Sequence, residues 1–207
     1  MVSDNSARGR PAGRTGEDLV AVAREVFLER GYDGTSMDEV ARRAKISKAS
    51  LYREHASKSA LYAAVVRQWA AAGRDSMRPA LERLMASADI RQGLTDLAEA
   101  MLAGILSPAV LAMRRLVASE ARSQPEVAET YLTESWHSNI RGLAEALRVI
   151  AADERLRIDD PVTAAEQFTW LVIGAPLNAR MLGVDGGVEG PATVRAVDLF
   201  LAGYAVR

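Results

Sequence analysis

The chain has 207 residues, about half of them hydrophobic and none a cysteine, which excludes a wholly disordered chain, disulfides and thiolate metal sites. Its net charge of −1 argues against a generic basic nucleic-acid binder. The polar first eighteen residues lack the apolar core of a secretory signal, and no uncharged stretch reaches the roughly 20 apolar residues of a membrane helix, so we expect a cytoplasmic protein without a membrane partner.

Apolar residues recur at helical spacing along the whole chain. This predicts an all-α fold of about nine helices, with an N-terminal three-helix head and a larger helical body. The first helix should begin near Thr15, its N-cap, and stop at Gly31, where glycine allows a left-handed backbone. The second should begin at Ser36, with Glu39 completing a capping box, and end near Ala44.

The later helices are expected from polar caps and prolines. Ser47 should cap a short third helix through Arg53, and Ser57 should cap a fourth. Pro79 either bends the fourth helix or begins the next one. Further starts are expected at Asp89, Ser107, Gln124, Asp160 and Pro191. Residues 125–152 should form one long helix, and Gly183, Gly186, Gly187 and Gly190 predict a turn before the last helix.

Residues 36–53 have the pattern of a helix-turn-helix, two short capped helices joined by a tight turn. Apolar residues would hold the two helices together: Val40, Ala41, Ala44, Ile46 and Leu51. The other face of the third helix would present side chains that suit a DNA groove: Lys48, Ala49, Ser50, Tyr52 and Arg53. Arg53 is long enough to reach a guanine edge or a phosphate. The helix starts at Ser36 and Ser57 would add backbone N–H donors for phosphates.

Basic charge is concentrated in the same region. Residues 1–58 carry eleven Lys and Arg against nine Asp and Glu, whereas the remainder carries fifteen against eighteen. All three lysines, Lys45, Lys48 and Lys58, lie within fourteen residues. Such a run is usually a solvated surface, and a helical hairpin is more often an ordinary part of a bundle. The lysines, the capping box and the spacing together favour DNA binding over that alternative.

The same region resembles the N-terminal signature of the tetracycline-repressor (TetR) family. The resemblance rests on Phe27–Ser36, Val40-Ala41, Ser47–Tyr52, Ser57-Lys58 and Leu61. It implies a DNA-binding head, a ligand-binding body and a homodimer built from the last two helices, acting on double-stranded operator DNA, usually as a repressor. By position it implies that Thr35, Lys48, Ser50, Tyr52 and Lys58 lie at or near the DNA backbone. With the motif, the candidate DNA-binding set is Thr35, Ser36, Ser47, Lys48, Ala49, Ser50, Tyr52, Arg53 and Lys58.

The sequence departs from the family pattern in the turn and after the third helix. Lys45 stands where glycine is common, Glu54-His55 where an aromatic commonly follows, and Ala56 where proline is frequent. Glu54 would repel phosphate, so we expect it to point away from DNA or to pair with Arg53. We divide the chain into a flexible basic arm (1–14), a helix-turn-helix domain (15–58) and an effector-binding and dimerisation domain (59–207). The arm would enter a minor groove or act only as a solubilising tail.

The helix expected over 162–182 is apolar nearly all round, so both of its sides must be covered. One side would lie in the chain's own body and the other against a second copy, with the last helix beside it. The candidate dimer residues are Val172, Gly174, Ala175, Leu177, Val194, Val197, Leu201 and Tyr204. The alternative is that both are ordinary core helices of a monomer.

Residues 114–183 resemble the AefR-like effector domain of one TetR subgroup, through the segments 120–122, 156–161 and 165–168 and through Pro125. An unknown small effector, apolar or aromatic, is the hypothesis. The candidate cavity residues are Met101, Ile105, Met113, Val117, Tyr131, Trp136, His137, Phe168 and Trp170. Met and aromatic residues at helical spacing are more often plain core, so packing stays the alternative for each of them.

The sequence gives little support to an enzyme, a metal site or a cofactor site. His55 and His137 are far apart, and neither has metal-ligand spacing with carboxylates. A phosphate loop would require a strand before it, and no strand is expected before the glycines near residue 186. Asp159 and Asp160 form a carboxylate pair, but Asp160 is better placed as an N-cap before Pro161. A helical dimerisation scaffold without DNA binding remains the second hypothesis, although it leaves the lysine-bearing head unexplained.

Overall fold

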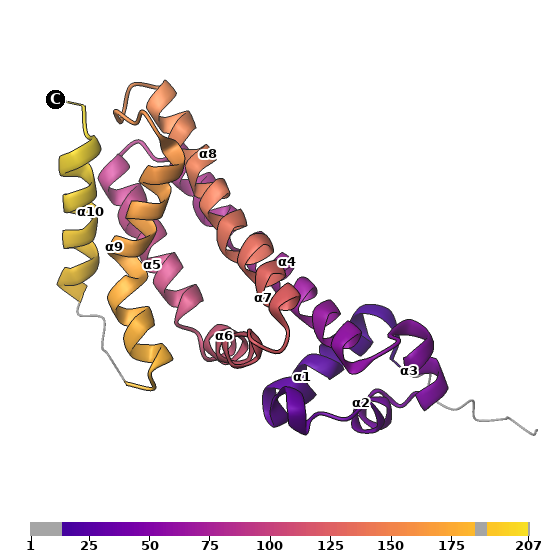
Figure 1. Ribbon diagram of the computed structural model, residues 1–207. Coiled ribbons are helices and arrows are strands. Elements are labelled where there is room, and N and C mark those ends of the chain that lie inside the picture. The colour runs from indigo at the N-terminus through magenta and orange to yellow at the C-terminus, as the bar shows by residue number, and fades with distance from the viewer. Residues whose placement is uncertain (1–13, 185–189, 207) are drawn as a thin grey trace, which may run out of the picture. The chain divides into compact units, whose positions relative to one another are not determined.

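The computed structural model describes residues 14–184 and 190–206, and every regular element within them is a helix (Figure 1). In chain order these are α1 (Gly16–Gly34), α2 (Met37–Ala44), α3 (Lys48–Glu54), α4 (Lys58–Ala86), α5 (Ile90–Ile105), α6 (Pro108–Glu120), α7 (Pro125–Tyr131), the π-helical segment η1 (Leu132–His137), α8 (Ser138–Ala152), α9 (Pro161–Met181) and α10 (Gly190–Tyr204). Because α7, η1 and α8 follow one another without a break, the described residues form nine helical runs, as expected.

The chain divides into two compact units between Val65 and Val66, so α4 begins in the first unit and ends in the second. We call residues 14–65 the head and the described residues from 66 onward the body. The boundary expected at residue 58 falls at the start of α4. The expected arm lies outside the described residues except for Arg14, as do Gly186 and Gly187 of the expected turn.

The head is built around an apolar seam between its short helices. Phe27, Tyr32 and Tyr62 form a ring cluster, with centroids 5.2–6.0 Å apart. Val40, Ala41 and Ala44 of α2 and Leu51 of α3 are buried, and Leu51 is 0% exposed. Aromatic pairs at this spacing add to the stabilisation that burial alone provides. The head therefore has a core of its own.

Hydroxyl caps begin the helices of the head as expected. Ser36 accepts from the Glu39 N–H at 3.2 Å, Ser47 from the Ser50 N–H at 3.0 Å, and Ser57 from the Ala60 N–H at 3.1 Å. Thr15 is the N-cap residue of α1, as expected, although its side chain makes no cap hydrogen bond. The expected capping box was wrong, because the Glu39 carboxylate turns to Arg43 at 2.8 Å.

Arg43 joins α1 to α2 through a forked ion pair. Its guanidinium donates to both carboxylate oxygens of Glu29, at 2.9 and 2.6 Å, and also to Glu39. This hydrogen bonding raises the pKa of Arg43 and lowers the pKa of Glu29. A bidentate pair fixes direction as well as distance, so the two helices are held in one orientation.

Lys45 ends α2 in the left-handed region, with φ 59° and ψ 33°. An L-residue is strained there by roughly 1 kcal/mol, whereas glycine is not. We therefore expect Lys45→Gly to stabilise the head by about 0.5–1 kcal/mol in chemical denaturation. As a matched control, Arg42→Gly, three residues earlier in regular helix, should destabilise it by a similar amount. Equal losses in both variants would contradict this account.

The body packs α9 against α8, α5 and α10 around one apolar core. Its helices begin at the expected caps: Asp89, Ser107 and Asp160 each accept from backbone N–H groups of the first turn. Pro79 lies inside α4, so it does not begin a new helix. In the described part of the chain no single helix is long and apolar enough to cross a membrane, although α5 and α6 together pass that test across a 61° bend.

Candidate functional site

The third helix of the head presents nearly all of its surface away from the protein. Among its residues only Leu51 is buried, and it packs on the α2 side of the head. Lys48, Ala49, Tyr52 and Arg53 are exposed, and Ser50 is half-buried. The side chains that the helix-turn-helix interpretation requires on the surface are therefore on the surface.

Two serines fix the first turn of α3. Besides accepting from the Ser50 N–H, the Ser47 hydroxyl lies 2.9 Å from the Ser50 hydroxyl and donates to it. Ala49, between them, has a side chain of only one methyl group. The start of α3 is thus rigid and small, so a flat surface can approach its backbone closely.

Lys48 already has an anionic partner. Its ammonium lies 2.7 Å from the Asp38 carboxylate of α2 and 6.0 Å from the centre of the Tyr52 ring. The hydrogen bond that Lys48 donates to the Asp38 carboxylate raises the pKa of Lys48 above its ordinary value. Both side chains are more than half exposed, so the pair is open to competition from another anion.

Two of the expected DNA contacts are engaged inside the head. Thr35 is 3% exposed, and its hydroxyl donates to the Gly31 carbonyl at 2.7 Å. This hydroxyl closes the turn after α1, so the side chain of Thr35 is engaged within the head. Lys58 donates to the carbonyls of Tyr32 and Asp33, at 2.9 and 3.4 Å, and covers the Tyr32 ring. It is a clamp on the end of α1 and not a free surface cation.

Glu54 points away from the exposed face of α3. Its carboxylate accepts from the Gly16 N–H at 3.0 Å, at the first turn of α1, where the helix dipole favours a negative charge. The expected alternative, a pair with Arg53, is not formed. Arg53 has no ion-pair partner within the described ranges, so its guanidinium is a free cation at the end of α3.

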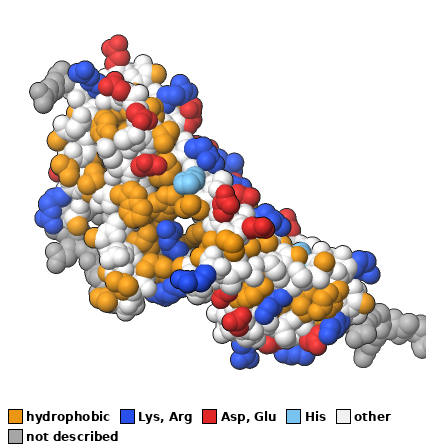
Figure 2. All heavy atoms as spheres, in the orientation of Figure 1, with side chains coloured by type: hydrophobic (Ala, Val, Ile, Leu, Met, Phe, Trp, Pro, Cys, Tyr) orange, Lys and Arg blue, Asp and Glu red, His pale blue; other side chains and the backbone are white. Residues whose placement is uncertain are grey.

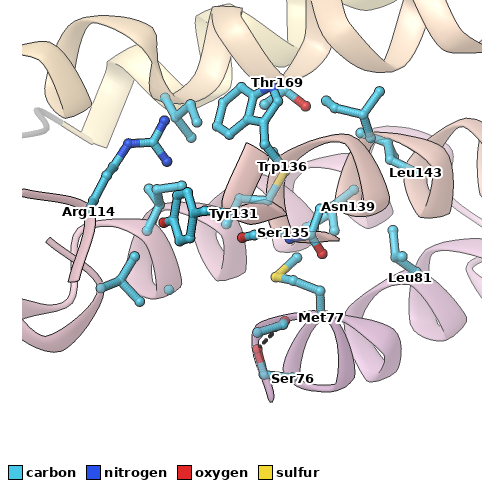
Figure 3. Close-up of a pocket in the computed structure, with 18 of the residues that line it drawn as sticks. Ser76, Met77, Leu81, Arg114, Tyr131, Ser135, Trp136, Asn139, Leu143 and Thr169 are labelled. Carbon is cyan, nitrogen blue, oxygen red and sulfur yellow. Dashed lines mark hydrogen bonds between the residues drawn. The ribbon is translucent and has the colours of Figure 1, made fainter. Parts of the chain in front are cut away.

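The body contains an apolar cavity of about 140 Å³ (Figure 3). It lies among α4, α5, α6, α9 and the helical run from α7 to α8. Its walls are Trp69, Gly73, Ser76, Met77, Leu81, Leu97, Met101, Gly104, Ile105, Val110, Arg114, Tyr131, Ser135, Trp136, Asn139, Ile140, Leu143, Thr169 and Ile173. On the face of the body drawn in Figure 2, apolar side chains gather with Lys or Arg side chains among them.

Four of the nine expected cavity residues line it: Met101, Ile105, Tyr131 and Trp136. The other five do not. Met113, Val117 and Phe168 are buried in packing contacts, and His137 is exposed. Trp170 is 53% exposed and lies outside the cavity, with its ring 5.1 Å from that of Trp136. On α6 the cavity wall is formed by Val110 and Arg114, which are four residues apart.

Sequence reasoning missed two features of this cavity. The run from Pro125 to Ala152 is not one regular α-helix, because six residues, Leu132–His137, form a π-helix. Ser135 and Trp136 of this segment face the cavity, and π-helical turns are frequent at functional sites. Arg114 was missed as well: its guanidinium lies 5.0 Å from the Trp136 ring.

The outer surface of α9 and α10 is apolar, and of the expected dimer residues only Tyr204 lines the groove found there in the described part of the chain. Val172, Leu177 and Val197 are buried in the chain's own core, Gly174, Val194, Leu201 and Tyr204 are half-buried, and Ala175 is exposed. Besides Val162, the large exposed apolar side chains of α9 and of the described part of α10 are Trp170, Leu171 and Leu199, at 53, 41 and 61%. These three line a shallow groove between the two helices, which we call the outer groove.

Comparisons with known proteins agree with this arrangement. Residues 19–65 match the model of bacterial regulatory proteins of the tetR family, and residues 92–206 match the C-terminal domain of AefR-like transcriptional repressors. The flavonoid-responsive regulator FrrA is 30% identical, with a TM-score of 0.74, over 91% of this chain and 96% of that one. This chain belongs to the TetR family of transcriptional regulators. A TetR-family regulator from Mesorhizobium loti has a TM-score of 0.85 at 25% identity, over 91% and 95% of the two chains.

Curated relatives are matched over shorter stretches. The transcriptional activator FasR of Mycolicibacterium smegmatis is 49% identical over 55 residues, which is 27% of this chain and 25% of that protein. The chain thus spans about a quarter of the length of this curated relative. TetR regulators bind operator DNA and small-molecule effectors, typically as dimers. The scaffold alternative is not favoured, because the head itself matches a DNA-binding family.

The structure accounts for two departures of this TetR-family chain from the expected pattern. Lys45 adopts the left-handed backbone that glycine commonly supplies in the turn, so the turn keeps its shape with a strained lysine. Glu54 caps α1 and lies away from the exposed face of α3, so its charge does not oppose a phosphate there. Neither departure disturbs the presentation of α3.

Proposed function

We propose that this DNA-binding regulator is a homodimeric repressor that acts in the cytoplasm by binding alone, with no catalytic step. Its α3 would lie in the major groove of operator DNA, and a small ligand in the body cavity would release it. The observation that carries this proposal is the exposed face of α3, held by one buried residue, Leu51, on the apolar seam of the head. A short helix fixed in this way needs no rearrangement to enter a groove.

The chemistry of that face divides the expected contacts into two kinds. Lys48, Ser50 and Tyr52 carry an ammonium and two hydroxyls, which suit phosphate oxygens and set the position on the duplex. Arg53 is the free cation at the far end, long enough for the O6 and N7 atoms of a guanine. Ala49 and the serine pair let the backbone come close to the bases. We expect the heads of the dimer to lie about 34–36 Å apart, the spacing of successive major grooves.

Binding to DNA from upstream of the chain's own gene tests the proposal. Fluorescence anisotropy over a salt series should give a dissociation constant of roughly 10⁻⁸–10⁻¹¹ M and a scrambled sequence far weaker binding. Lys48→Ala should weaken binding and lower the salt slope by about one, the share of one phosphate contact. Arg148→Ala, which removes an exposed cation of α8 paired with Glu145, is the matched control and should change neither. Equal affinity for both sequences would refute specific regulation.

Removing the ion-pair partner of Lys48 should have the opposite effect and tighten DNA binding. A phosphate must compete with the Asp38 carboxylate, 2.7 Å away, and is repelled by its charge. Asp38→Asn should therefore tighten DNA binding about three- to tenfold at low salt, with a smaller gain at high salt. Anisotropy on the same duplex measures this. Weaker binding of Asp38→Asn would mean that Asp38 positions Lys48 and does not compete with DNA.

A homodimer through the outer groove completes the proposal. Three large apolar side chains, Trp170, Leu171 and Leu199, are exposed side by side on α9 and α10. An exposed patch of this kind on a small protein is a typical contact surface. Pairing α9 and α10 with the same helices of a second copy would bury it, and TetR regulators typically act as dimers.

A further inference from the structure

We propose that the body cavity binds a planar aromatic acid of one or two rings, whose carboxylate pairs with Arg114. This proposal rests on the effector role of the cavity proposed above and names the class of ligand. Three properties of the cavity support it: a cation in an apolar wall with no carboxylate partner among the described residues, a volume suited to a ring, and a row of polar side chains that form no hydrogen bond to other described residues.

Arg114 is the charged group of the cavity wall. It is half-buried on α6, and its guanidinium lies 5.0 Å from the centre of the Trp136 ring. Across the described ranges it meets no carboxylate, whereas Arg43, Arg91 and Arg148 each form two hydrogen bonds to one. A half-buried charge without a counter-ion is costly, so a ligand that supplies the anion gains from that imbalance.

The size and walls of the cavity suit an aromatic ring. Its volume is about 140 Å³, and an apolar cavity of about 150 Å³ holds benzene. Trp69 and Trp136 supply flat surfaces, and Met77 and Met101 supply side chains that adapt to the shape of a ligand. In Figure 3 the Arg114 side chain reaches toward Trp136. A carboxylate on a ring lying along Trp136 would therefore be within reach of the guanidinium.

Polar groups of the helical run from α7 to α8 complete the site. Tyr131, Ser135 and Asn139 follow one another at four-residue spacing and all line the cavity. Their side-chain hydroxyls and amide make no hydrogen bond to another described residue. They are placed to bind ring substituents such as hydroxyl groups. The Ser76 hydroxyl, by contrast, is already bonded to the Gly73 carbonyl at 2.8 Å (Figure 3).

The charge of Arg114 also decides between ligand classes. A neutral hydrocarbon would fill the cavity but leave the guanidinium uncompensated, and a cationic ligand would be repelled by it. An aromatic acid satisfies both the apolar walls and the cation. The arginine fork binds a carboxylate through two parallel hydrogen bonds, which gives direction as well as attraction.

Calorimetric titration of the full chain with two matched pairs tests the proposal: benzoate against benzamide, and 2-naphthoate against 2-naphthamide. Each pair keeps the rings and removes only the charge. We expect at least one acid to bind tenfold or more tightly than its amide. Arg114→Gln should erase this preference. Arg141→Gln, which removes an exposed cation of α8, is the control and should preserve the preference.

The outcomes separate this inference from the effector role. The ligand class is overturned if neither acid binds, if acid and amide bind equally, or if the preference survives in Arg114→Gln. Anisotropy on operator DNA with the bound acid then tests regulation. An acid that binds through Arg114 without weakening the DNA complex would confirm the ligand class and contradict the effector role, because linked sites must affect each other reciprocally.

Discussion

Replacing Leu199 with aspartate is expected to convert the dimer into monomers and to weaken specific DNA binding by about 10²–10⁴-fold. Leu199 is 61% exposed and lines the outer groove with Trp170 and Leu171. In the proposed dimer, aspartate at this position would place a charge in an apolar contact and bring it close to the same charge on the second copy. Both the burial of the charge and the repulsion oppose association. Because the side chain is exposed in the protomer, the fold of the body should survive.

The loss of DNA affinity follows from the loss of the second head. A dimer binds the second half-site at a high effective concentration, whereas a monomer binds one half-site alone. Sedimentation velocity and anisotropy measure the two effects on the same samples. Leu132→Asp is the matched control, since Leu132 is 46% exposed on η1, outside the outer groove, and should stay dimeric. A wild-type monomer at micromolar concentration, or a dimeric Leu199→Asp, would contradict the proposed interface.

Leu51→Ala is expected to destabilise the head by about 2–5 kcal/mol and to abolish specific DNA binding, while the body keeps its stability. Leu51 is 0% exposed and is the one buried residue of α3, so its truncation leaves a cavity under the helix that would contact DNA. The head forms a compact unit with its own core, which predicts that the damage stays local.

Hydrogen exchange resolved along the chain measures this effect. Amides of residues 14–65 should lose protection in Leu51→Ala, and those of the body should not. Leu147→Ala is the reciprocal control, because Leu147 is 0% exposed in the core of the body and should lower protection there. Equal loss of protection in both units for either variant would show that they unfold together.

Those features of the fold that depend on neighbouring residues could be predicted from the sequence. Ser36, Ser47 and Asp160 cap their helices because the cap needs only a side-chain oxygen and an N–H two or three residues ahead. The bonds that Thr35 and Lys58 make within the head could not be predicted in this way. Their partners are carbonyls at the end of α1, and a linear pattern does not show which polar side chains turn inward to reach them.

The cavity was predicted only in part, for a geometrical reason. A regular helix over 125–152 gives one register of side chains, but the π-helix at Leu132–His137 shifts that register by about one residue. Tyr131 and Trp136 could be predicted because they are aromatic, whereas a linear pattern does not show whether polar residues such as Ser135 and Arg114 face a cavity or solvent. Only the packing of α6 beside η1 turns Arg114 toward Trp136.

The outer groove shows a similar limit. The apolar residues of α9 surround the helix, so the pattern predicts two covered sides without saying which side is which. Val172 and Leu177 proved to face the chain's own core, and Trp170 and Leu171 to face outward. The position of α5, α8 and α10 around α9 decides this, and that information is tertiary.

The claim that α3 lies in the major groove can be measured directly by methylation protection of guanine N7, an atom exposed only in that groove. On the operator, the account predicts two clusters of protected guanines about one helical turn, or a multiple of it, apart. Arg53→Ala should restore methylation at one position in each cluster. Bound DNA whose guanine N7 atoms are all as reactive as in free DNA would contradict the account.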